Sequence, residues 1–125
     1  MFNQKRRLRT YLTRCIMLAG SLPAGVLLFY LKSATPNRRL KHREYVAVTH
    51  EELARATLLT PRQVRNALPT LYKKGWVVAE QHRRGYKTVN HYIVTKEFYE
   101  AFESDDVKYH TEESTQVAAW KATQG

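Results

Sequence analysis

Residues 48–94 read VTHEELARATLLTPRQVRNALPTLYKKGWVVAEQHRRGYKTVNHYIV, and this stretch decides the fold. Thr49 stands three residues before Glu52, and Thr60 three residues before Gln63. This is the capping-box pattern, in which a Thr hydroxyl and a Glu or Gln side chain satisfy the free N–H groups at a helix start. The two starts are 11 residues apart, which leaves room for a short first helix and a tight connection. The spacing predicts a helix-turn-helix.

Each of the two helices has one predicted apolar face. Leu53, Ala54 and Thr57–Leu58 follow the first cap at helical spacing. In the second helix the apolar residues recur at i, i+3, i+4 and i+7, namely Val64, Ala67, Leu68 and Leu71. Gly75 stands where a helix ends in a left-handed residue, after two lysines that favour the negative end of the helix dipole.

A β-hairpin is predicted to follow the second helix. Residues 76–82 and 87–94 are rich in strand-forming residues, and Arg83-Arg84-Gly85-Tyr86 joins them with a Gly in the turn. The hairpin tip is therefore cationic and aromatic. The apolar run 45–48 is expected to add a short third strand.

The residues LARATLLTPRQV (53–64) and NALPTLYKKGWV (66–77) resemble the winged helix-turn-helix domain of small bacterial transcription regulators and of plasmid and phage replication proteins. Ala54 matches the small residue that this family has in the first helix, and Val64 matches the apolar residue of its recognition helix. Leu58 stands where Gly is usual, and Pro69 lies inside the recognition helix on its solvent side. The resemblance covers roughly residues 22–99. It implies an α+β, mostly helical fold with a two- to three-stranded wing sheet.

The flanking segments suggest three parts: an N-terminal amphipathic helix within 1–21, the winged domain at 22–103, and an acidic flexible tail at 104–125. The first helix, over residues 3–19, has an apolar stripe that includes Tyr11 and Cys15, whereas Arg14 falls on its basic side. We expect this stripe to pack on the domain or on a second copy, which would give a homodimer. A further helix is expected after Thr95, with Phe98, Tyr99 and Phe102 on one face.

A membrane-spanning segment is the rival interpretation of residues 15–31, which are 17 residues without a charge. The stretch 20–23, Gly-Ser-Leu-Pro, interrupts this run with a stop followed by a new helix start. We therefore expect a cytoplasmic, nucleoid-associated protein.

The net charge of +10 is unevenly distributed. Residues 1–96 hold 19 of the 21 Lys and Arg and 4 of the 11 Asp and Glu. Residues 97–125 hold the other 2 basic residues and 7 acidic residues. A small domain this basic is expected to bind a polyanion; the alternative is that the charge only keeps the surface soluble.

No catalytic or metal-binding pattern emerges from the sequence. Cys15 is alone, the five His are scattered, and no nucleophile elbow, phosphate loop or carboxylate pair stands out. The sequence thus predicts a binding protein without metal or cofactor, and not an enzyme.

Double-stranded DNA is the polyanion that the resemblance implies. The second helix offers side chains that can bond base edges, namely Arg62, Gln63, Arg65 and Asn66. Candidate contacts to the DNA backbone are Thr60, Arg38, Arg39, Lys41, Arg43, Lys73 and Lys74. Candidate wing contacts are Arg83, Arg84, Tyr86 and Lys87.

Each of these assignments has a structural alternative. Gln63 could serve only as a helix cap, and Arg65 could be only a solvent-exposed charge on the helix surface. The loop at 35–44 could be a solvated linker, and the hairpin tip an ordinary polar turn.

The expected role is sequence-specific duplex DNA binding by a homodimeric transcriptional regulator. One alternative shares the fold: a plasmid or phage replication or partition protein that binds repeated DNA sites. Alternatives of another class are a protein–protein adaptor, whose winged surface contacts an acidic partner, and a membrane-anchored protein.

Overall fold

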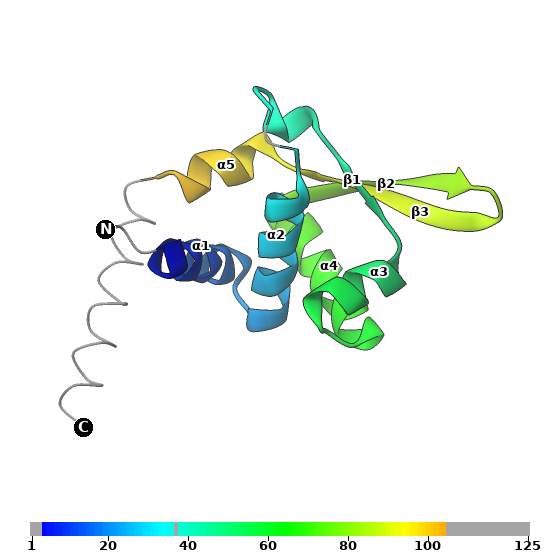
Figure 1. Cartoon of the computed structure of the whole chain (residues 1–125), viewed down its shortest axis with the longest axis horizontal. Coiled ribbons are helices and arrows are strands. Elements are labelled where there is room, and N and C mark those ends of the chain that lie inside the picture. Colours follow the sequence, from blue (N-terminus) through cyan, green and yellow to red (C-terminus); the bar gives the residue numbers. More distant parts are fainter. Residues whose placement is uncertain (1–3, 37, 105–125) are drawn as a thin grey trace.

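The computed structural model describes the backbone of residues 4–36 and 38–104, and the side chains of residues 11–36 and 38–104 (Figure 1). The α+β prediction is confirmed. Along the chain these ranges form α1 (Gln4–Ala19), α2 (Leu22–Ala34), the 3-10 turn η1 (Lys41–Arg43), β1 (Val46–Val48), α3 (His50–Thr57), α4 (Pro61–Lys74), β2 (Val77–Arg84), β3 (Lys87–Val94) and α5 (Lys96–Phe102). Most of the expected acidic tail, residues 105–125, lies outside the described residues.

The three strands form one antiparallel sheet in the order β1-β3-β2. The expected third strand is confirmed as β1. In the hairpin, Arg84 pairs with Lys87, so the turn consists of Gly85 and Tyr86 alone. The expected four-residue connection was too long, because Arg83 and Arg84 continue β2. Gly85 has φ +66°, a conformation that a two-residue hairpin turn commonly requires.

Both predicted capping boxes are present. The Thr49 hydroxyl accepts from the Glu52 N–H at 3.1 Å, and the Thr60 hydroxyl accepts from the Gln63 N–H at 3.1 Å. Gly75 ends α4 with φ +77°, as expected. Thr60 and Gln63 therefore fix the start of α4, and Gly75 fixes its end.

Leu58 does not pack as an apolar residue of the first helix, which corrects that prediction. It is the C-cap of α3, with φ +61°, and its side chain is 92% exposed. The helix ends one residue earlier, where the Thr57 hydroxyl donates to the Leu53 carbonyl at 2.6 Å. The turn needs a left-handed residue at this point, and Leu keeps the conformation that Gly would adopt more easily.

The core lies between the helices and the inner face of the sheet. Its largest fully buried side chains are Tyr92, Phe98, Phe102, Leu27, Leu28, Leu31, Leu53 and Leu71. Helices α1 and α2 approach closely at Gly25, where a Cβ would lie 2.5 Å from the Cα of Ile16. Any larger residue there would push α1 away from α2.

Arg14 is buried rather than on the basic side of α1, which corrects a second prediction. It is only 7% exposed, and its guanidinium carbon lies 5.6 Å from the centre of the Tyr11 ring and 5.3 Å from that of Phe102. Helix α5 covers this side of α1, so the guanidinium contacts two aromatic rings instead of water.

The strained turn at Leu58 yields a stability prediction. Leu58→Gly should raise the free energy of unfolding by roughly 0.5–1 kcal/mol, because relief of the left-handed strain exceeds the entropy that Gly adds to the unfolded chain. Urea unfolding measures the change. Leu58→Ala is the matched control, since it removes the same exposed side chain but keeps the strain. An equal gain in both variants would show that exposure, and not backbone strain, is the cause.

Cys15 yields a prediction for alkaline pH. Burial raises the pKa of its thiol from 9.0 to about 12, although Lys32 and Arg14 oppose the shift. The unfolded chain releases this proton above about pH 8.5, whereas the folded chain keeps it, so stability is lost as pH rises beyond that point. Between pH 8 and 10 the wild type should lose about 2 kcal/mol more than Cys15→Ala.

Lys32 also makes stability depend on pH, so the effect of Cys15 is measured as the difference between the wild type and Cys15→Ala. Burial lowers the pKa of its ammonium group, so this residue adds stability as pH rises. Denaturant titrations of both proteins across this range measure the difference. Parallel curves would contradict the assignment to Cys15.

Candidate nucleic-acid interface

Helix α4 has one buried face and one exposed, cationic face. Val64, Ala67, Leu68 and Leu71 are buried against the body of the domain. Arg62, Arg65 and Asn66 are exposed on the other side. Among the described residues, neither arginine is within ion-pair distance of an acidic group. The donors of both guanidinium groups are therefore available to a ligand.

Pro69 lies on this exposed face, and α4 runs unbroken from Pro61 to Lys74 through it. Pro69 has no N–H to donate to the carbonyl of Arg65, four residues earlier. Both Arg65 and Pro69 are exposed, so the missing bond lies on the solvent side of the helix and not in the core. The prediction that this proline is tolerated on the solvent side is confirmed.

Thr60 and Gln63 differ from the other candidates on α4, because their side chains already hold the helix start. The Gln63 carbonyl oxygen accepts from the Thr60 N–H at 2.9 Å, and the Thr60 hydroxyl accepts from the Gln63 N–H. Among the described residues, the side-chain amide N–H groups of Gln63 and the hydroxyl proton of Thr60 have no hydrogen-bond partner. Both residues can donate to DNA without losing the cap.

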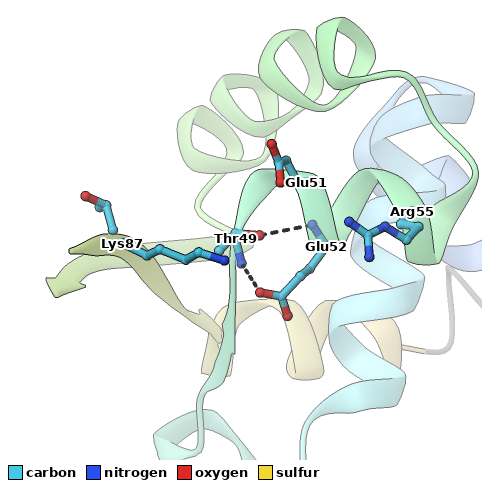
Figure 2. A pocket seen from close by; sticks show the side chains of 6 residues that line it. Thr49, Glu51, Glu52, Arg55 and Lys87 are labelled. Atoms are coloured by element: carbon cyan, nitrogen blue, oxygen red, sulfur yellow. Dashed lines mark hydrogen bonds between the residues drawn. The ribbon is translucent and has the colours of Figure 1, made fainter. Parts of the chain in front are cut away.

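The wing extends beyond α3 and α4 (Figure 1), and the residues at its end are exposed. Tyr86 is 91% exposed in the turn, and Arg83 and Arg84 are exposed at the end of β2. Lys87 differs from these residues: its side chain runs back toward Thr49 at the start of α3 (Figure 2). Three of the four wing candidates thus surround the tip, and the fourth faces the helices.

A polar contact ties the wing to α3. The Asn90 amide nitrogen donates to the Tyr92 hydroxyl at 2.9 Å and lies 3.3 Å from Nε2 of His50, the first residue of α3. The Tyr92 side chain is fully buried. This contact holds the inner face of the wing against the helix-turn-helix.

An open cleft of about 470 Å³ separates the start of α3 from the wing (Figure 2). Its lining is polar and carries both signs of charge, consisting of Thr49, Glu51, Glu52, Arg55, Lys87 and Thr88. Small-molecule sites are usually lined by apolar groups, so this cleft does not resemble an effector pocket. In the described part of the chain, no cluster of three or more His, Cys, Asp or Glu could hold a metal ion.

The candidate backbone contacts do not form one surface. Thr60 caps the start of α4, whereas Lys73 lies about 20 Å further along the helix and Lys74 packs near Gly20 at the end of α1. The loop that carries Arg38, Arg39, Lys41 and Arg43 lies across the sheet from α3 and α4 (Figure 1). Arg38 also pairs with Glu44 at 3.8 Å, at an exposed position where such pairs contribute little.

A row of stacked rings on the outer face of the sheet was missed by the sequence analysis. The ring of His91 stacks on Tyr45 at a centroid distance of 4.2 Å, and on His82 at 3.8 Å. Strand alternation could have placed His82 and His91 on one face. Their stacking depends on the pairing of Val89 with His82, a register that the sequence did not reveal.

Comparisons with protein-family models and with curated proteins gave no match to this chain. Within the described residues, no helix is both long and apolar enough to cross a membrane.

Proposed function

We propose that this chain binds duplex DNA in a sequence-specific manner, with α4 in the major groove and the wing beside it, and that it acts as a homodimeric transcriptional regulator. The observation that supports this proposal is the exposed face of α4, where Arg62, Arg65 and Asn66 project from a helix whose opposite face is buried. The strong positive charge of residues 1–96 gives the polyanion preference.

The shape of α4 suits this role. An α-helix with side chains is about 10–12 Å wide, and the major groove of B-form DNA is about 12 Å wide. Arg62 and Arg65 can each pair bidentately with guanine, and Asn66 with adenine. These side chains lie in the first two turns, which is the part of a recognition helix that reaches the bases.

The wing supplies the second part of the binding surface. Arg83 and Arg84 would neutralise phosphates next to the groove or enter a narrow minor groove, and the exposed Tyr86 ring would pack on the sugar–phosphate backbone. Glu51 and Glu52 on α3 would repel phosphates. The duplex is therefore expected to contact α4 and the wing tip rather than enter the cleft beside α3.

Substitutions on α4 and on the wing should have different effects. Arg62→Ala or Asn66→Ala should cost roughly 1–3 kcal/mol on the preferred site and far less on random DNA. Arg83→Ala or Arg84→Ala should weaken binding to the preferred site and to random DNA alike. Each should reduce the slope of log K against log salt concentration by about 0.9. Sites selected from a random duplex pool, titrated beside scrambled duplexes at several salt concentrations, provide the measurement.

Lys96→Ala is the matched control for these variants, because it removes an exposed cation on α5 that pairs with Glu100 at 3.9 Å. It should leave the affinity for both duplexes unchanged. If Arg62→Ala and Asn66→Ala weaken random DNA as much as the selected site, α4 does not read bases. Failure of the wild-type protein to bind any duplex would favour a protein–protein adaptor.

Footprinting distinguishes the two DNA-binding roles. A single palindrome near a promoter supports regulation of transcription, because paired half-sites match a two-fold dimer. Tandem repeats would support a plasmid or phage replication or partition protein. The same surface of α4 serves both roles.

The proposed homodimer must use the outer side of α1. Cys15 and Ala19 already pack inside the chain, while Met17 is 43% exposed and Leu22, at the start of α2, is 63% exposed. We expect a two-fold contact through these side chains. Light scattering should give the mass of a dimer at a protein concentration of about 10⁻⁵ M, which is above a Kd of about 1 μM (about −8 kcal/mol), and Met17→Glu with Leu22→Glu should give a monomer. A monomeric wild type, with and without DNA, would contradict this expectation.

A further inference from the structure

We propose that the outer face of the sheet is a second nucleic-acid site, which binds single strands by stacking bases on the rings of Tyr45 and His82. This site lies across the sheet from α3 and α4 (Figure 1), and nothing in duplex binding by α4 requires it.

The rings form a continuous stack across three segments of the chain. The planes of Tyr45 and His91 are 6° apart, and those of His91 and His82 are 16° apart. His91 is the middle ring, so both of its faces are covered. Tyr45 and His82 each keep one free face, and both side chains are exposed, with Tyr45 at 51% and the His82 side chain at 42%. A base can therefore extend the stack at either end.

Cations flank both ends of this stack. Tyr45 directly follows the loop that carries Arg39, Lys41 and Arg43, and η1 in that loop contacts β3. Beyond His82, the alternation of β2 places Arg84 on the same face. A row of aromatic rings with cations at both ends suits a strand whose bases stack and whose phosphates are neutralised.

Single strands fit this surface better than a duplex does. The faces of paired bases in a duplex are covered by their neighbours, whereas unpaired bases can turn toward an aromatic ring. Glu80 lies on the same face, with its carboxylate 3.6 Å from Nε2 of His82. A phosphate would avoid that carboxylate, so the backbone should follow the two cationic ends.

The test uses the full chain and a fluorescent oligothymidylate of about 12 nucleotides, with the oligouridylate of equal length as the RNA counterpart. Tyr45→Leu and His82→Leu should each weaken binding of these single strands about fivefold or more, whereas Tyr45→Phe and His82→Phe should retain it. Glu80→Gln should tighten binding. A 2-aminopurine in the oligonucleotide should lose fluorescence on binding to the wild type and much less on binding to the leucine variants.

Duplex titrations separate this site from the proposed function. Tyr45→Leu and His82→Leu should leave duplex affinity unchanged, and Arg62→Ala and Asn66→Ala should leave single-strand affinity unchanged. A wild type that binds single strands but no duplex would overturn the role of α4 and leave the stacking site standing.

Three results would overturn the stacking site itself. In the first, the wild type binds no single strand at low salt. In the second, the leucine and phenylalanine variants bind equally, so that charge alone holds the strand. In the third, the leucine variants lose duplex and single-strand binding together. Because Tyr45 and His82 are exposed, these variants should fold, and Glu80→Gln tests the site without altering any ring.

Discussion

The arrangement of the whole domain depends on the junction where α4 ends and β2 begins. Gly75 takes the left-handed conformation that ends α4, and its carbonyl accepts from the Thr95 hydroxyl at 2.6 Å. The next residue, Trp76, donates from its indole nitrogen to the Leu18 carbonyl at 2.8 Å, and its own carbonyl accepts from the Thr95 N–H at 3.0 Å. These bonds join α4, α1, β2 and the start of α5 within two residues. Because β2 starts directly after Trp76, the direction of the wing relative to α4 is fixed here.

The sheet that leaves this junction separates two charged surfaces. On its inner side, Tyr92 and the buried face of α4 form the core, so the outer side of α4 must face solvent. On its outer side, β1 and β3 bring Tyr45 and His91 together beside the basic loop. The same fold therefore presents a helix suited to a groove and a row of rings suited to unpaired bases, on opposite sides of a thin sheet. A protein that binds both forms of DNA at once would need this separation, because the two ligands could not share one surface.

The sequence predicted the features that depend on near neighbours. Both capping boxes and the Gly75 end of α4 follow from contacts within a few residues, which spacing alone reveals. Several features that depend on distant residues were not predicted correctly. Arg14 is buried because α5 covers it, and the basic loop lies across the sheet because β1 pairs with β3. On the candidate site, the exposed face of α4 was predictable from its periodicity, whereas the ring stack required the strand register.

Two prolines limit the part of α4 that would read bases in the proposed complex. Pro61 starts the helix, and Pro69 leaves the carbonyl of Arg65 without its usual helical donor in the middle of the exposed face. The segment between them holds Arg62, Arg65 and Asn66, whereas the remainder of the helix leads to Lys73 and the Gly75 junction. From Pro61 to Pro69 the helix rises about 12 Å, which matches about three to four base pairs at 3.4 Å each. Such a short contact specifies few positions, so a distinctive binding site requires the wing, a second copy of the chain, or both.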